Sequence, residues 1–291
     1  MGAVKSDRFY LLASALSGLI FAASGALTRA GKGFASSFLV IFVHGIICSA
    51  IFLAFGFFRP AAKLSKLDRK NLIVRTIFAA VGIGCLTINY SLSPLPFAFA
   101  IANSGPFFFA LVETFNFRKA KSFKFLLGFC LIGLGTLVMC VTASDSAGFF
   151  GISVGVVGAL FSGLSFRKLS VVAGSIEWHV IGFYLGTGLV FLGVLGVSLS
   201  PWRVSGLRIH LIAMSGVLLF FAQALMTIGF KKLSGVLASV LSFSSIAWAS
   251  LLQTQTINAF QGVTNILCYI CMAVGAALIA MEDRRRTVCE N

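Results

Sequence analysis

The chain alternates about ten apolar runs with short basic segments, and this alternation constrains its fold more than any other feature. A transmembrane helix needs roughly 20 apolar residues, and in lipid it satisfies its own backbone hydrogen bonds. Runs of that length take up most of the 291 residues, which leaves no separate soluble domain. The chain is therefore predicted to be an all-α integral membrane protein with ten transmembrane helices. These are Phe9–Thr28, Phe34–Phe58, Leu72–Tyr90, Leu95–Phe117, Phe123–Thr142, Phe149–Ser170, His179–Leu199, Leu211–Phe230, Leu233–Thr254 and Ala259–Met281.

The net charge of +15 is explained by topology and does not indicate a nucleic-acid partner. If the N-terminus is cytoplasmic, 19 of the 23 basic residues fall in cytoplasmic segments. Arg75 is counted among these 19, and only Arg29, Lys32, Arg203 and Arg208 fall outside. This bias is the positive-inside rule. It predicts a multi-pass protein of the inner (cytoplasmic) membrane with both termini in the cytoplasm.

The two halves of the chain resemble each other. A shift of 140 residues aligns Thr87 with Thr227 and Ser104 with Ser244, and a shift of 145 aligns Ser17 with Ser162. Each half holds five predicted spans, and an odd number inverts the second half in the membrane. We therefore predict two inverted five-helix repeats, residues 1–145 and 146–291, with a substrate site at their interface near the membrane midplane.

The segment 89–140 carries a resemblance to a known family. It combines a polar helix end, Pro106 within a span, Glu113 at the cytoplasmic end of that span, a basic loop and a glycine-rich fifth span. The chain resembles the drug/metabolite transporter superfamily in its EamA-type ten-span form. Among family members it is also similar, in size and in its phenylalanine-rich spans, to the S-adenosylmethionine carriers of intracellular bacteria. The resemblance implies an alternating-access transporter.

Polar residues deep in apolar spans are the candidate substrate-binding residues, because they are costly in lipid unless they face a cavity or a partner helix. Two symmetry-related spans each offer hydroxyl groups beside aromatic rings, a combination that suits an amphipathic metabolite. The first span contributes Asn103, Ser104 and Phe108, and the second contributes Ser242, Ser244, Ser245 and Trp248. The alternative is that the serines bond back to their own helices and Asn103 to a neighbouring helix. We expect Trp248, Asn103 and the serines to line one central cavity.

Further candidates complete the lining. Gln223 lies within the predicted span Leu211–Phe230, and Asn89 and Tyr90 lie at the end of the predicted span Leu72–Tyr90. His44 is either a titrating group or a structural hydrogen-bonding residue. Arg167 and Lys168 either reach the cavity, where one would bind a substrate carboxylate, or anchor the helix at the cytoplasmic surface.

The predicted function is alternating-access transport of a small amphipathic metabolite. No carboxylate lies deep in a span, which favours exchange over proton coupling, and the specific hypothesis is exchange of S-adenosylmethionine for S-adenosylhomocysteine. The alternatives are export of amino acids or amphipathic drugs, and a structural membrane protein without transport activity. The histidines are scattered along the chain. We therefore predict that the protein is not an enzyme and has no catalytic residue, cofactor or metal site. The expected partners are the metabolite and the lipid bilayer, and we expect a monomer, with a dimer as the alternative.

Overall fold

The described elements of the protein are all α-helices. The structure is a computed structural model that describes residues 2–33, 36–58, 64–105, 108–109, 122–142, 144–199, 206–233, 235–241, 244–252, 266–275, 277–279 and 281–282. The helices are α1 (Gly2–Lys32), α2 (Ser37–Phe58), α3 (Lys66–Leu92), α4 (Leu95–Asn103), α6 (Phe123–Thr142), α7 (Ser144–Val172), α8 (Trp178–Leu199), α9 (Ile209–Phe230), α10 (Gly235–Leu241) and α11 (Ser244–Leu252). Residues 266–275 are helical as well. No strand occurs in these ranges.

Six of the helices are long and apolar enough to cross a membrane: α1, α2, α3, α7, α8 and α9. Their outer faces carry large apolar side chains, and Phe57, Phe149 and Leu199 are 85%, 87% and 81% exposed. Contiguous exposed apolar surface is rare on water-soluble monomers and suits contact with lipid. The prediction of an all-α protein with long apolar helices is confirmed. The second, fourth, ninth and tenth predicted spans fall partly outside the described residues.

Local sequence explains several helix boundaries. The helix α3 begins at Lys66, six residues before the predicted span, because the Ser65 hydroxyl oxygen accepts a hydrogen bond from the Asp68 backbone N–H at 3.0 Å. Pro94 follows the end of α3, since the residue before a proline is disfavoured in helical conformation. Near the start of α7, Gly148 has a φ of 64°, a conformation that glycine adopts without strain. This kink coincides with the predicted start of the sixth span at Phe149.

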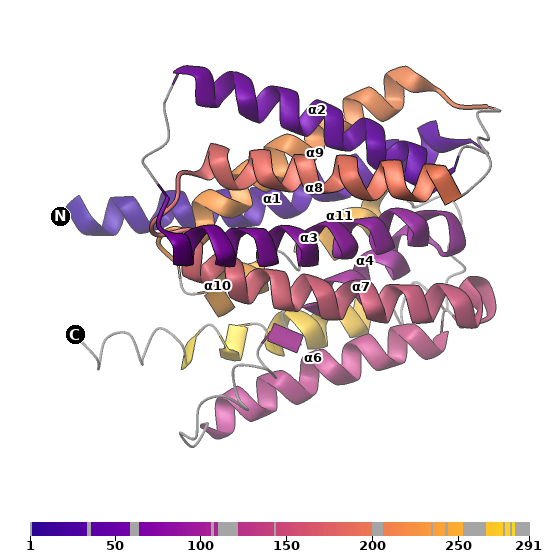
Figure 1. Cartoon of the computed structure of the whole chain (residues 1–291). Helices are drawn as coiled ribbons and strands as arrows, with labels where there is room; N and C mark the ends of the chain where they lie inside the picture. Colours follow the sequence, from indigo (N-terminus) through magenta and orange to yellow (C-terminus); the bar gives the residue numbers. More distant parts are fainter. Residues whose placement is uncertain are drawn as a thin grey trace.

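The helices lie side by side in one bundle (Figure 1). The most extensive packing joins α2 to α8, α1 to α9 and α3 to α7, and α4 packs against α7 and α11. Glycines allow close approach in these interfaces. A Cβ atom at Gly186 of α8 would lie 2.6 Å from the Ser49 backbone nitrogen of α2, and one at Gly163 of α7 would lie 2.5 Å from the Gly105 carbonyl oxygen. These glycines therefore serve packing between helices of the same chain.

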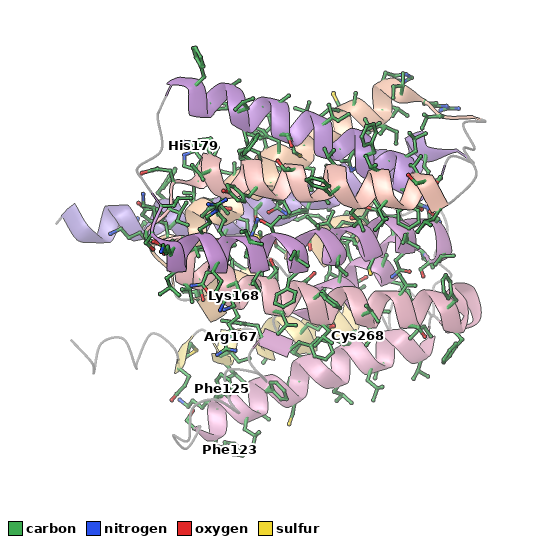
Figure 2. All side chains as sticks on the ribbon, viewed as in Figure 1. Phe123, Phe125, Arg167, Lys168, His179 and Cys268 are labelled. Atoms are coloured by element: carbon green, nitrogen blue, oxygen red, sulfur yellow. The ribbon has the colours of Figure 1, made fainter. Side chains whose placement is uncertain are left out.

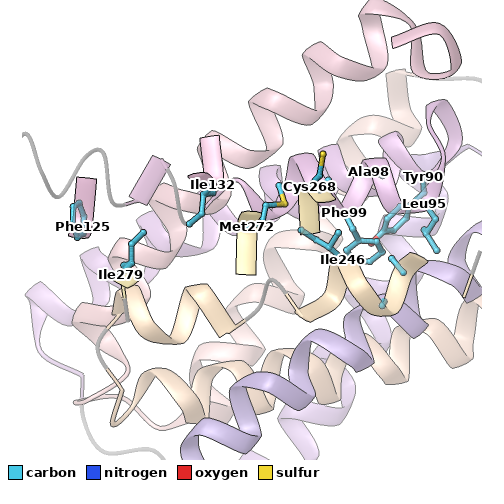
Figure 3. Packing of buried hydrophobic residues seen from close by; sticks show 13 residues of the cluster. Tyr90, Leu95, Ala98, Phe99, Phe125, Ile132, Ile246, Cys268, Met272 and Ile279 are labelled. Carbon is cyan, nitrogen blue, oxygen red and sulfur yellow. The ribbon is translucent and has the colours of Figure 1, made fainter. Parts of the chain in front are cut away.

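A buried apolar cluster joins residues of α1, α3, α4, α6 and α11 to helical residues within 266–275 and 277–279. Tyr90, Leu95 and Phe99 lie at one end of this cluster, while Phe125 and Ile279 lie at the other (Figure 3). Cys268 is buried within it as a free thiol.

Candidate functional site

A cavity lies between helices from both halves of the chain. Its volume is about 80 Å³, which is smaller than most small-molecule sites. Six helices line it: α1, α3, α4, α7, α9 and α11. Its lining is Phe21, Arg75, Ala79, Gly82, Ile83, Leu86, Phe99, Ala102, Ser162, Ser165, Phe166, Gln223, Met226 and Ser245. The α3 residues in this set occupy the middle of that helix, so the cavity lies at mid-height in the bundle.

Arg75 is the charged residue of this lining. Its side chain is 1% exposed, and it lies nine residues after the first residue of α3. At 1.5 Å per residue, this places its backbone roughly 14 Å inside the helix. Its Nη2 donates to Oε1 of Gln223 at 3.4 Å, and its Nη1 donates to the Ile181 carbonyl oxygen at 3.4 Å. Both hydrogen bonds are long, so the guanidinium is only weakly held by the protein.

Hydroxyl groups and aromatic rings share the cavity lining with the guanidinium. Ser162 and Ser165 of α7 and Ser245 of α11 supply the hydroxyls. Phe21, Phe99 and Phe166 supply rings from three different helices. Convergent polar groups in a largely apolar cavity can orient a ligand while the rings contact its apolar part.

Two of the sequence-predicted residues, Gln223 and Ser245, line the cavity. Gln223 is 4% exposed, and its backbone carbonyl oxygen accepts a hydrogen bond from the Thr227 hydroxyl at 2.8 Å. Ser245 is 2% exposed at the start of α11. These residues come from neighbouring predicted spans and approach the cavity from two helices.

Trp248 does not line this cavity. Its side chain is 40% exposed, although it lies only three residues after Ser245. Three residues correspond to about 300° of helical rotation, and here the large ring takes a position on the outer surface of α11. Ser244 donates instead to the Ala15 carbonyl oxygen of α1 at 3.0 Å. Ser242 and the side chain of Asn103 lie outside the described residues.

Four other predicted residues do not belong to the cavity lining. The Tyr90 ring contacts the Phe99 ring with centroids 5.5 Å apart, so Phe99 stands between Tyr90 and the cavity. Ser104 bonds back to the Ile101 carbonyl oxygen of its own helix at 2.7 Å, which was the alternative interpretation. Phe108 packs in the cluster around Ile101 on the α7 side. Asn89 accepts a hydrogen bond from the Ser93 hydroxyl at 2.6 Å, and its buried Nδ2 has no partner.

His44 joins two helices and lies away from the cavity lining. Its Nε2 is 2.6 Å from the hydroxyl oxygen of Ser215, which connects α2 to α9, and the same hydroxyl donates to the Ile212 carbonyl oxygen. The ring is 3% exposed. This geometry matches the structural alternative predicted for His44. Across the described ranges, no group of three or more His, Cys, Asp or Glu side chains lies together in a way that could hold a metal ion.

Arg167 and Lys168 lie on the second half of α7, toward the end of the bundle where Phe123 and Phe125 also lie (Figure 2). Both side chains are half-buried, and α7 continues past them to Val172. The Lys168 ammonium donates to Oδ1 of Asn71 on α3 at 3.0 Å. Neither residue belongs to the cavity lining. Lys168 therefore connects two helices beside the cavity, a position between the two predicted alternatives.

Sequence reasoning missed Arg75, which it counted with the cytoplasmic segments. That count is wrong for this residue, because α3 carries it into the buried centre of the bundle. The missed signal was the position of Arg75 inside the predicted span Leu72–Tyr90, where a charge is costly without a function or a partner. Two serines of α7 that line the cavity, Ser162 and Ser165, were missed too.

No family model and no curated protein matches the sequence of this chain. The fold does have relatives, because 28 chains of solved structures resemble it. One of these, known only as "Crystal structure of protein", has a TM-score of 0.67 and 18% sequence identity, with 94% of this chain and 98% of that chain covered. At this level of identity the similarity shows a shared fold alone.

Proposed function

We propose that the protein is an alternating-access transporter of a small amphipathic metabolite in the inner membrane, with both termini cytoplasmic. The observation that carries this proposal is the central cavity, which buried polar groups and aromatic rings line at mid-height in a bundle of apolar helices. Ionisable residues at such depth mark substrate pathways in membrane proteins. A purely structural bundle would gain no stability from burying Arg75 and Gln223 around an empty space.

Two inverted five-helix repeats, and thus ten spans, are supported by matching contacts at a constant offset of 144 residues. Between α1 and α9, the contacts pair Ser14 with Gly229, Ser24 with Ser215 and Gly31 with Ile212. Adding 144 to the first residue number of each pair and subtracting 144 from the second gives the equivalent pairs in the other repeat. These are Gly158 with Cys85, Lys168 with Asn71 and Ser175 with Asp68. All three are contacts between α7 and α3 or at their ends.

The remaining helix pairs fit the same two-fold relation. The helix α2 packs against α8, and α4 packs against α11, which are the pairs that a two-fold axis maps onto themselves. A Cβ atom at Gly128 of α6 would meet the Gly275 carbonyl oxygen, and one at Gly275 would meet the Gly128 carbonyl oxygen. Two halves related in this way can exchange conformations and expose a central site to each side in turn.

Contacts at the two ends of α3 are the candidate gates. At its C-terminal end, Nη1 of Arg29 donates to the Ser93 carbonyl oxygen at 2.9 Å and ties α1 to α3. At its N-terminal end, Lys168 donates to Asn71 and ties α7 to α3. We expect the two contacts to break in alternation, because a carrier must not open to both sides at once.

The specific substrate hypothesis is exchange of S-adenosylmethionine for S-adenosylhomocysteine. Rings in the lining can contact the adenine, and the hydroxyls and the guanidinium can hold the amino-acid end. Export of amino acids or amphipathic drugs needs the same type of cavity and is the alternative. The carrier acts as a monomer in this proposal, since the cavity is complete within one chain.

Uptake into proteoliposomes tests the transport function. We expect uptake of radiolabelled S-adenosylmethionine, stimulated by preloading with S-adenosylhomocysteine. The variant Ala102→Phe places a ring into the cavity and should abolish uptake, while Ala54→Phe, on the exposed face of α2, should leave it unchanged. If the folded protein transports neither this substrate, nor amino acids, nor amphipathic dyes, the structural-protein alternative is favoured.

A further inference from the structure

Arg75 carries a buried positive charge that the described part of the protein does not neutralise. The described carboxylates of Asp68, Glu177 and Glu282 lie at or beyond helix ends, and none forms an ion pair with it. Its Nε is buried and has no hydrogen-bond partner among the described residues. Burying an unpaired cation is strongly unfavourable. A group that persists in this state is suited to receive a negative charge from outside the chain.

The neighbours of Arg75 fit an oxyanion. Gln223 already contacts the guanidinium through its amide oxygen, which leaves the amide nitrogen as a second donor. The hydroxyls of Ser162 and Ser165 lie on the same cavity wall, one helical turn apart on α7. A planar guanidinium can donate two parallel hydrogen bonds to the oxygens of a carboxylate or phosphate. This interaction is stronger where water is excluded.

The apolar side of the cavity indicates what the anion is attached to. Phe21, Phe99 and Phe166 come from three helices and line the same cavity as the polar groups. Aromatic rings stack against flat ligands and gain from contact area as well as from ring geometry. The site therefore combines one cation with several aromatic walls.

We propose that Arg75 binds the oxyanion of the transported solute and that the solute is an organic acid carrying an aromatic ring. This inference rests on the proposed transport function and narrows its substrate class. Among the earlier alternatives it favours solutes with a free carboxylate or phosphate over cationic drugs.

Binding to the purified protein in detergent tests the inference without transport. The probes are indole-3-acetate, its neutral analogue indole-3-acetamide, and phenyl phosphate, each measured by the shift in melting temperature. We expect the acid to bind at least tenfold more tightly than the amide. The phosphate shows whether the site prefers carboxylates or phosphates. This comparison uses the wild-type protein, so it does not depend on a variant that folds.

Variants then assign the preference to one residue. In Arg75→Gln the preference for the acid over the amide should disappear, and in Arg75→Lys it should survive in weaker form. The matched control is Arg69→Gln, an exposed position on the same helix, which should retain wild-type binding. Equal shifts with acid and amide, no shift with either anion, or an unchanged acid preference in folded Arg75→Gln would each overturn the proposal.

The two proposals fail in different ways. If Ala102→Phe blocks uptake but Arg75 confers no anion preference, transport stands and the substrate class is wrong. If Arg75 binds the acid but proteoliposomes show no uptake of that acid or of any other probe, the anion site stands and the transport function is wrong.

Discussion

Substituting Gly45 with alanine should separate α2 from α8. A Cβ atom at this position would lie 2.5 Å from the Val190 backbone nitrogen and 2.9 Å from the Leu189 carbonyl carbon. Cβ contacts below 3.0 Å essentially never occur, and backbone atoms cannot rotate away. The two helices must therefore move apart by about 0.5 Å or more, which loosens side-chain packing along the interface.

The size of the effect follows from two opposing contributions. Overpacking of this kind destabilises by about 1–3 kcal/mol. Alanine also favours the helical conformation over glycine by up to about 1 kcal/mol. Gly56→Ala on the same helix provides the control, because its Cβ would meet only the His179 side chain, at 3.3 Å. The helix-propensity gain is shared, so the free energy of unfolding should be about 1–3 kcal/mol lower for Gly45→Ala than for Gly56→Ala.

Unfolding in mixed micelles with increasing SDS, followed by tryptophan fluorescence, measures this difference. Trp178 is a suitable reporter because its ring contacts the rings of Phe52 and Phe55 on α2, with centroids 5.9 Å and 5.4 Å apart. Equal stability of the two variants would refute the reasoning, since it would mean that the backbones of α2 and α8 are not in contact at Gly45.

Two further predictions concern residues outside the cavity. Ser215→Ala leaves Nε2 of His44 without its partner, so we expect the free energy of unfolding to fall by about 1–3 kcal/mol and the KM for uptake to stay unchanged. A raised KM at wild-type stability would instead place His44 at the substrate. Trp248→Ala should retain wild-type uptake, because the ring is 40% exposed on the outer surface of α11; a folded variant with impaired uptake kinetics would return Trp248 to the site.

Much of the helical layout could be predicted from the sequence, because hydrophobic length is a local property. The predicted spans Phe123–Thr142 and Phe34–Phe58 agree closely with α6 and α2. The predicted start of α3 was wrong by six residues, since the Ser65 cap draws a polar turn into the helix. Hydropathy detects the apolar part of a helix but not the polar turns that extend it.

The candidate site was less predictable than the helices. Polarity inside a span selected Gln223 and Ser245, and both line the cavity. The same criterion also selected His44 and Ser104, whose hydrogen bonds are satisfied by a neighbouring helix or by their own. A sequence gives the polarity of a residue without giving its partner.

The sequence by itself determined that this chain forms apolar helices, where several of them begin and end, and that few charges are buried among them. Only the tertiary structure decided which face of each helix meets the cavity. Arg75 points to a central space and Trp248 to the outer surface because of how α3 and α11 pack against other helices. Helices in lipid are apolar all around, so hydrophobic periodicity does not distinguish the inner face from the outer one. Close packing between distant segments makes that choice.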